Sequence, residues 1–87
     1  MMFVILVYDV NVKRTAKVLK TVRPYLSHLQ RSVFEGELTE KELEELKSEL
    51  EDLIKPSEDT VLIYTFDSLR YSHRHRIGRQ LEDRDII

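Results

Sequence analysis

Three features of the sequence predict an α+β fold. Its patterns follow the order strand, helix, extended stretch, helix, strand and tail. Two apolar segments, at 2–8 and 60–66, have the composition of strands, and each of the two amphipathic segments is closed by a proline. Two helices and three to four strands in this order fit a split βαβ arrangement, the ferredoxin-like sandwich.

The first strand and the first helix are predicted from the segment 2–26. Residues 2–8 are β-branched or aromatic without polar alternation, which favours a central strand covered on both faces. Asn11 can cap the next helix through its side-chain oxygen, and Pro24 should end or kink that helix. Apolar residues at steps of three and four predict its buried stripe: Val12, Ala16, Leu19, Val22 and Leu26.

The middle of the chain predicts extended structure followed by a second helix. Gly36 indicates a bulge or a tight reversal within 28–38, which leaves open whether this stretch is one bent strand or two. Thr39 and Glu42 have the spacing of a capping box, and Pro56 should stop the helix. The predicted buried stripe of this helix is Leu43, Leu46, Leu50, Leu53 and Ile54.

The chain beyond the last apolar strand becomes polar and basic, which predicts a loop or a mobile segment. We therefore expect a ferredoxin-like domain at 1–67 and a basic C-terminal extension at 68–87. The extension ends in Asp85-Ile86-Ile87, and an apolar terminus usually docks against a folded surface. These residues are predicted to form a short docking strand.

The two long strands also predict a homodimer. Each is apolar on both faces, whereas a ferredoxin-like sheet has helices on only one face. A second copy of the chain is the simplest cover for the other face, and two-fold symmetry is the commonest arrangement of such pairs. A chain of 87 residues also buries a modest share of its surface alone, so a partner would stabilise it.

Charge is segregated along the chain, although the net charge is only −2. Residues 10–34 contain no acid and six basic residues, whereas 35–59 contain eleven acids. This pattern favours a basic surface for polyanions, and the alternative is two solvated helix faces that attract each other. Because cysteine is absent, a disulfide framework and a cysteine nucleophile are excluded. The N-terminal apolar run is too short for a membrane span, so we expect a cytoplasmic protein.

Asp9 is the candidate metal ligand, because it follows a central strand at the end where ligands often bind. A lone carboxylate is a poor Mg²⁺ site, but a two-fold dimer could hold one ion between two Asp9 side chains. The alternative is that Asp9 caps the following helix together with Asn11. Asp59 starts the last strand nearby and is a weaker second ligand within the chain. His73 and His75 lack a third ligand and are a weak metal signal.

Four segments together resemble the CRISPR-associated Cas2 family. They are the strand ending VYDV, the basic helix after it, QRSVFEGEL with its acidic helix, and DTVLIYTF. The likeness covers about residues 3–66 and is most specific at 32–38. It implies a ferredoxin-like homodimer in which Asp9 binds Mg²⁺ at the interface and the final strand adds to the partner's sheet. It also implies that Arg14 and Phe34 match a basic and a phenylalanine position of the family.

The resemblance implies two functions that the residues do not separate. In the first, Asp9 is the catalytic residue of a metal-dependent endonuclease acting on RNA or double-stranded DNA. In the second, the dimer is a non-catalytic DNA-binding scaffold, placed between dimers of the Cas1 integrase during spacer acquisition in antiviral defence. The candidate phosphate-binding residues are Lys13, Arg14, Lys17, Lys20 and Arg31. A small-ligand regulatory dimer is a third alternative, but the chain has only two glycines and no glycine-rich ligand loop.

Overall fold

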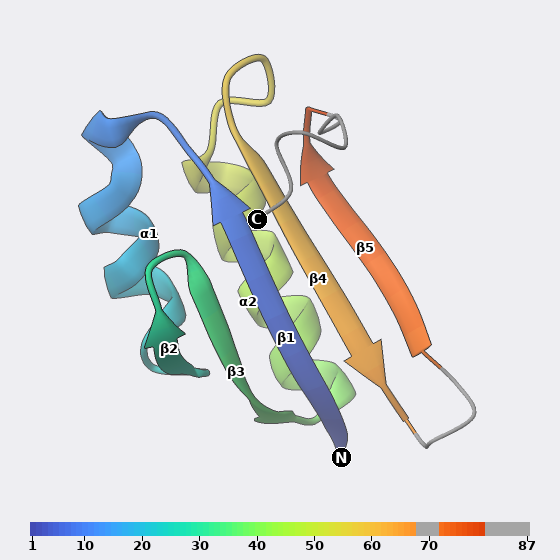
Figure 1. The fold of residues 1–87 in the computed structure, drawn as a ribbon. Helices are drawn as coiled ribbons and strands as arrows, with labels where there is room; N and C mark the ends of the chain where they lie inside the picture. The colour runs from blue at the N-terminus through green and yellow to red at the C-terminus, as the bar shows by residue number, and fades with distance from the viewer. Residues whose placement is uncertain (68–71, 80–87) are drawn as a thin grey trace.

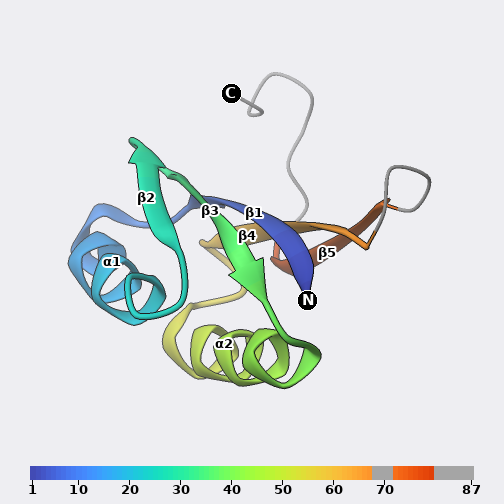
Figure 2. The same cartoon turned by 90° about the horizontal axis from the view of Figure 1, so that it is seen from below.

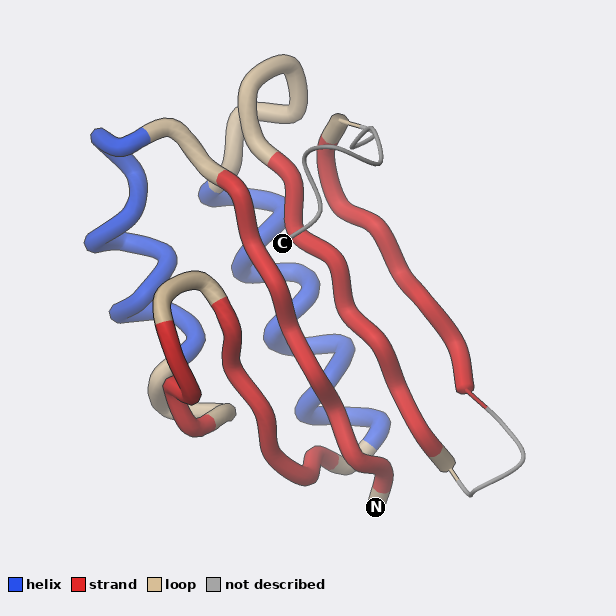
Figure 3. Tube along the Cα trace, in the orientation of Figure 1, coloured by secondary structure: helices blue, strands red, loops and turns tan. Residues whose placement is uncertain are grey.

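A computed structural model describes residues 1–67 and 72–79 of the chain. Figure 1 and Figure 3 show a layer of strands and a layer of helices that extend along the length of the domain. The elements are β1 (Met2–Asp9), a 3₁₀ turn η1 (Val12–Arg14), α1 (Thr15–Val22), β2 (Ser27–Gln30), β3 (Val33–Leu38), α2 (Glu40–Leu53), β4 (Thr60–Phe66) and β5 (Ser72–Gly78).

The sheet confirms the predicted ferredoxin-like arrangement. Its strand order is β2-β3-β1-β4-β5, and every neighbouring pair is antiparallel. Both helices lie on one face of the sheet, and within residues 1–67 and 72–79 no helix covers the opposite face, which we call the open face (Figure 2). The described chain thus has a helix-covered face and an open face, and side chains alternate between them along each strand.

The core fills the space between the helices and the covered face. β1 contributes Val4, Leu6 and Tyr8, whereas its alternate residues are only partly buried. The single chain supplies helices to one face only, so the predicted cover of the other face by a second copy stays a prediction. The rest of the core includes Val18, Val22, Phe34, Leu38, Leu43, Leu46, Leu50, Val61 and Ile63.

Helix α1 begins later than its apolar pattern predicts. Asn11 does act as a cap, because its Oδ1 accepts from the backbone N of Lys13 at 3.1 Å, but the first turn is 3₁₀ rather than α. This turn shifts the helical register, so Val12 is 87% exposed and Ala16 is also exposed. The predicted stripe is therefore wrong at its first two positions, and α1 buries Val18 instead.

The second helix follows its prediction closely. Thr39 Oγ1 accepts from the backbone N of Glu42 at 3.1 Å, and Glu42 Oε1 accepts from the backbone N of Thr39 at 2.9 Å. These bonds form the predicted capping box, and the Thr39 backbone bond is the main cause that lowers the pKa of Glu42. The helix ends at Leu53, before Pro56, as expected.

The extended stretch forms two strands, and its reversal lies earlier than Gly36. The chain turns at Arg31, which has φ +39°, while Gly36 stays inside β3. His28 Nε2 lies 2.5 Å from the Arg31 carbonyl oxygen, and Tyr8 Oη lies 3.4 Å from the same atom. Arg31 adopts the left-handed backbone region that L-residues seldom adopt, and two side-chain contacts hold its carbonyl oxygen in place.

Strand β5 corrects the expectation of a loop after residue 67. Residues 72–78 pair with β4 along their whole length, from Phe66↔Ser72 to Thr60↔Gly78. The polar pattern concealed this strand because β5 is an edge strand, where exposed charged side chains are common. The division of the chain at residue 67 stays a prediction, and the docking strand expected at 85–87 lies outside the described residues.

Candidate metal and nucleic-acid site at the end of β1

Asp9 ends β1 with its side chain on the open face. It has the same parity along the strand as Phe3, Ile5 and Val7, and it lies opposite Thr60 of β4. Its side chain is 50% exposed. Capping of the following turn belongs to Asn11, so the alternative of Asp9 as the helix cap is not supported. The carboxylate is thus placed for a ligand rather than for the helix.

The cation next to Asp9 comes from the far end of the chain. Arg79 Nη2 donates to Asp9 Oδ2 at 2.9 Å, across the intervening strand β4. Asp9, Thr60 and Gly78 are aligned across three strands, so the end of β5 brings Arg79 to this edge. Arg79 is not among the site residues predicted from the sequence, because 70 positions separate the two partners and no local pattern links them.

Asp59 directly precedes Thr60, the cross-strand partner of Asp9, but has a different environment. It is fully buried, and its Oδ1 accepts from the backbone N of Asn11 at 2.8 Å and from Arg14 Nη2 at 3.1 Å. Its Oδ2 accepts from Arg14 Nε at 2.5 Å and from the backbone N of Lys55 at 2.8 Å. Asp59 therefore joins the β1–η1 and α2–β4 connections, and its engaged oxygens make it unsuitable as the second metal ligand. We call Asp59 with Asn11, Arg14, Lys55 and Glu58 the Asp59 junction.

The Asp59 junction is ionised at neutral pH. Burial alone raises the pKa of Asp59, but the hydrogen bonds from Arg14 and from two backbone N–H groups outweigh it and lower the pKa. The pKa of Glu58 is lowered by hydrogen bonds from Arg14 and then Lys55, and Arg14 Nη2 lies 2.6 Å from Glu58 Oε1. The pKa of Arg14 is raised in turn, chiefly by the bond to Asp59.

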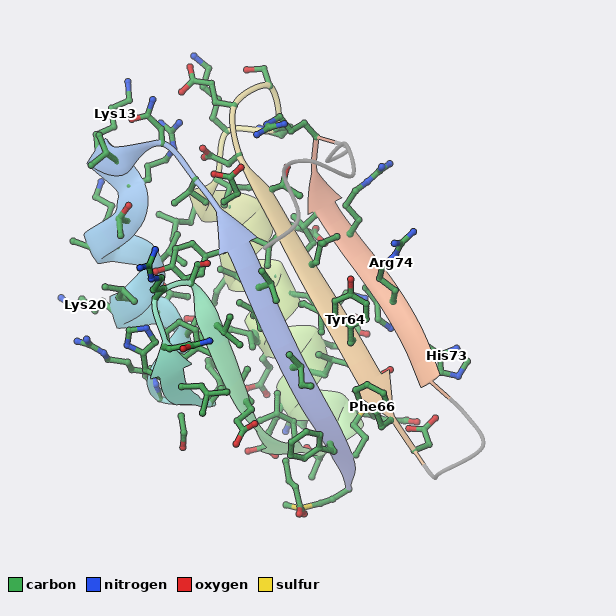
Figure 4. All side chains as sticks on the ribbon, in the orientation of Figure 1. Lys13, Lys20, Tyr64, Phe66, His73 and Arg74 are labelled. Atoms are coloured by element: carbon green, nitrogen blue, oxygen red, sulfur yellow. The ribbon has the colours of Figure 1, made fainter. Side chains whose placement is uncertain are left out.

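The predicted phosphate-binding residues divide into two groups. Arg14 is only 14% exposed and belongs to the Asp59 junction, so it is not available to a phosphate in this arrangement. Lys13, Lys17 and Lys20 are exposed, and Figure 4 shows Lys13 and Lys20 on the side of α1 away from the sheet. Within the described part of the chain these three lysines form no ion pair.

Arg31 is exposed at the turn between β2 and β3. This turn lies beside the end of β1, because the backbone N of Tyr8 donates to the Ser32 carbonyl at 3.1 Å. Arg31 and Lys13 thus lie at the same end of the sheet as Asp9, and Lys17 and Lys20 continue along α1.

The open face has an apolar centre with charged flanks. Phe3 is 38% exposed and packs against Phe66, with ring centroids 6.3 Å apart. Figure 4 shows Tyr64 and Phe66 on this face, with Arg74 on the neighbouring strand. The centre consists of Phe3, Ile5, Val7, Val33, Leu62, Tyr64 and Phe66, of which Leu62 is buried. Its flanks are Glu35 and Glu37 on β3 and Arg74 and Arg76 on β5.

The candidate metal ligands around Asp9 fit Mg²⁺ only in part within one chain. Mg²⁺ prefers oxygen ligands and is often held by one or two carboxylates together with water and substrate phosphates. Asp9 supplies one such carboxylate. Among residues 1–67 and 72–79, no group of three acidic, histidine or cysteine side chains could hold a metal ion. His73 Nε2 lies 3.9 Å from Asp67 Oδ2, at the opposite end of the sheet.

Two surface hollows lie away from Asp9. One, of about 530 Å³, is lined by Tyr25 and residues of α2. The other, of about 350 Å³, is lined by Met2, α2 residues and the two histidines of β5. Asp9 lines neither of these two hollows. Neither α1 nor α2 is long and apolar enough to cross a membrane, within the residues described.

Comparison with known proteins places this arrangement in a family. The family model for CRISPR associated protein Cas2 matches residues 2–74. The chain belongs to the Cas2 family. It is 46% identical over 86 residues to the CRISPR-associated endoribonuclease Cas2 of Dictyoglomus turgidum, covering 99% of both chains. It is 48% identical over 77 residues to the protein of the same name from Thermotoga maritima, covering 88% of both.

Solved Cas2 structures share the fold. One crystal structure of a Cas2 protein has a TM-score of 0.74 and 43% identity, covering 99% of this chain and 97% of that one. The structure of Streptococcus pyogenes Cas2 at pH 6.5 has a TM-score of 0.67 and 34% identity, covering 74% of this chain and 83% of that one. The α+β fold and the Cas2 family predicted from the sequence are confirmed.

Proposed function

We propose that this Cas2 protein is a homodimeric, Mg²⁺-dependent endonuclease for RNA or double-stranded DNA, acting in the cytoplasm with the Cas1 integrase during CRISPR spacer acquisition. The observation that carries the proposal is the position of Asp9 on the open face of the sheet. This face is apolar at its centre, so a partner that covers it would also reach Asp9. The names of the two curated relatives, both endoribonucleases, support the nuclease activity.

Charges on the open face favour one geometry for the dimer. Glu35 and Glu37 lie on one side of the apolar centre, and Arg74 and Arg76 lie on the other. A two-fold axis parallel to the strands would set the acidic flank of one copy against the basic flank of its partner. That axis leaves both Asp9 residues at the same end of the interface. An in-plane axis perpendicular to the strands would oppose like charges and separate the two carboxylates.

In such a dimer the two Asp9 carboxylates would hold the metal ion, and water and substrate phosphate would complete its shell. When bound, Mg²⁺ would polarise the phosphodiester and lower the pKa of a nucleophilic water. The chain's own residues would bind the nucleic acid. Lys13 and Arg31 lie at the Asp9 end of the sheet, and Lys17 and Lys20 extend the contacts along α1.

The non-catalytic scaffold is a second candidate, favoured by a specific observation. Three exposed lysines of η1 and α1 are free of ion pairs with described residues, whereas Asp9 is the exposed carboxylate that the described part of one chain offers at the candidate site. Phosphate binding without sequence preference needs only such lysines. This function would use the same dimer and need no cleavage.

Replacement of Asp9 by asparagine separates the two functions. We expect Asp9→Asn to lose Mg²⁺-dependent cleavage of single-stranded RNA and duplex DNA while it still binds duplex DNA, because the lysines are unchanged. Asp67→Asn is the matched control, since Asp67 is exposed at the other end of the sheet. Unchanged cleavage by Asp9→Asn would refute the paired carboxylates. If the wild type cleaves neither substrate but binds duplex with a steep salt dependence, the scaffold is the function.

A further inference from the structure

The ring of His28 is a feature that the proposed function does not yet use. His28 is exposed on the edge strand β2, where it lies opposite Phe34 of β3. The two rings are stacked, with centroids 4.6 Å apart and planes 21° from parallel. Phe34 is fully buried, so the imidazole covers the core with one face while His28 itself remains exposed. The outer face of the imidazole is therefore the part that a ligand can reach.

A hydrogen bond to the turn between β2 and β3 fixes the orientation of this ring. His28 Nε2 lies 2.5 Å from the Arg31 carbonyl oxygen, and because a carbonyl can only accept, Nε2 carries the hydrogen. This bond and the stacking on Phe34 are the hydrogen bonds, ion pairs and ring contacts that His28 makes with described residues. The ring is thus held at one edge and one face, so a ligand that packs on the outer face would not have to immobilise it.

The two contacts do not by themselves require an exposed aromatic ring. The Arg31 carbonyl, in a residue with φ +39°, needs a donor, which an amide side chain would also supply. Phe34 needs an apolar cover, which an aliphatic side chain would also supply. An aromatic ring with one face toward solvent offers something further, because it is the surface on which an unpaired nucleobase stacks.

Cations lie around the ring, at the end of the sheet proposed to bind nucleic acid. Arg31 is exposed in the same turn. The backbone N of Tyr8 donates to the Ser32 carbonyl at 3.1 Å, so this turn adjoins the end of β1. Burial raises the pKa of the Tyr8 hydroxyl, and the positive charge of Arg23 opposes this rise, so Arg23 also lies within electrostatic reach of the turn. A base stacked here would carry its phosphate into positive surroundings.

The ring stays accessible in the proposed dimer. His28 and Phe34 are cross-strand partners and point to the same face of the sheet, as do Phe34 and Leu6. Leu6 and Phe34 belong to the core under the helices, so His28 lies on the helix-covered side, at the edge of the sheet. The proposed interface is the open face on the other side. Its formation would leave His28 exposed in both copies.

We propose that His28 is a base-stacking residue, whose outer face packs on one unpaired base of a bound nucleic acid. This inference rests on the proposed function only in that the chain binds nucleic acid, and it applies to the nuclease and the scaffold alike. A paired base in a duplex has both faces covered by neighbouring base pairs, so His28 gives the site a preference for an unpaired base. Arg31, in the adjoining turn, contacts the phosphate of that nucleotide.

Two substitutions separate base stacking from support of the turn. His28→Phe keeps an aromatic ring but has no donor for the Arg31 carbonyl, whereas His28→Gln keeps an N–H donor but has no ring. Affinities for a single-stranded RNA oligomer and for duplex DNA are measured by fluorescence anisotropy with a chelator, which prevents metal-dependent cleavage. We expect His28→Gln to weaken single-strand binding by about five- to 150-fold, the range for loss of one stacked base, and His28→Phe to stay within about threefold of wild type.

Duplex affinity and a neighbouring residue provide the controls. The duplex affinity of both variants should stay within about twofold of wild type, and so should both affinities of Gln30→Ala, which alters another exposed residue of β2. If His28 only holds the turn, the order of the variants is reversed and His28→Phe binds more weakly than His28→Gln. That order, equal losses for single strand and duplex, or an equal loss in Gln30→Ala would overturn the inference.

A strand without bases tests the stacking itself. An abasic strand of the same length keeps the phosphates of the RNA oligomer and removes every base. We expect wild type and His28→Gln to bind this strand with affinities that agree within about twofold, because the contact that the substitution removes is already missing. A difference as large as the one on RNA would show that His28 contacts the backbone of the nucleic acid instead of a base.

The outcomes separate this inference from the proposed function. If wild type binds neither the RNA oligomer nor the duplex, the proposed function fails and the inference fails with it. If wild type binds both and the two His28 variants bind equally well, only the base-stacking role fails. Should a variant not fold, the ring protons of His28 are followed by NMR while the RNA oligomer is added to wild type. A stacked base shifts these signals upfield through its ring current, and signals that do not move would overturn the inference.

Discussion

Asp9 ends β1 and Asp59 directly precedes the adjacent strand β4, and the two aspartates have opposite roles. Asp9 lies opposite Thr60 in the sheet, so the residue next to Asp59 is its direct cross-strand neighbour. Asp59 is fully buried and accepts hydrogen bonds from two backbone N–H groups and from Arg14. Asp9 is half exposed and is paired with the side chain of Arg79. The carboxylate group of Asp59 therefore joins two connections of the chain, whereas that of Asp9 remains accessible to solvent.

The hydrogen-bond donors around each carboxylate explain why Asp59 is structural and Asp9 is accessible. The N–H groups of Asn11 and Lys55 belong to the backbone, so they cannot leave Asp59 unless the chain itself moves. The partner of Asp9 is the guanidinium of Arg79, which also donates through Nε to the Glu58 carbonyl at 3.4 Å. A buried carboxylate held by backbone donors stabilises the fold, whereas a half-exposed one can be reached by a ligand from solvent. The comparison can be tested by removing each carboxylate in turn.

The largest effect is expected for Asp59→Ala. The substitution leaves Arg14 and two backbone N–H groups without their acceptor in a buried position, and we expect it to lower the free energy of unfolding by about 3 kcal/mol. Urea unfolding at one protein concentration measures the change, since the stability of the proposed dimer would depend on concentration. Asp67→Ala is the control and should change stability by less than about 0.5 kcal/mol. Similar values for the two variants would show that the Asp59 junction does not stabilise the fold.

A smaller effect is expected on acidification of the wild type. The folded-state pKa values of Asp59 and Glu58 are lowered from 3.8 and 4.5, so their stabilising contribution is fully present above about pH 4.5. It is lost as the pH falls through the lowered folded-state values. Urea unfolding of wild type and Asp59→Ala at pH 7, 5, 4 and 3 should therefore give a constant difference down to about pH 5, and a shrinking one below it. A difference that stays constant to pH 3 would contradict the lowered pKa of Asp59.

The sequence predicted elements whose signals are local. β1 and β4 are apolar runs, and α2 carries both its capping box and its leucine stripe within one segment. β5 escaped prediction because its residues at the open face are arginines, which an edge strand tolerates in water. The reversal at Arg31 escaped because a side-chain contact from His28 holds a non-glycine residue at positive φ.

The candidate site was predictable only where a local pattern marks it. Asp9 follows directly from the end of an apolar strand. The burial of Arg14 does not follow, because a run of basic residues looks the same whether a member is solvated or paired with an acid 45 positions away. Arg79 is separated from Asp9 by still more of the chain. Contacts of this kind depend on the packed sheet, which brings the starts and ends of β1, β4 and β5 together.

The smallest effect on stability is expected for Asp9→Asn. The pair with Arg79 is half exposed, and exposed pairs contribute at most about 1 kcal/mol, so we expect a change within about 0.5 kcal/mol by urea unfolding. The amide keeps the size of the side chain and one oxygen as an acceptor for Arg79. The same variant should nevertheless lose Mn²⁺ binding in calorimetry, because a neutral amide is a weak ligand for a hard cation. A loss of stability that approaches the value for Asp59→Ala would mean that Asp9 also holds the fold together. The contrast between an accessible carboxylate and a structural one would then no longer stand.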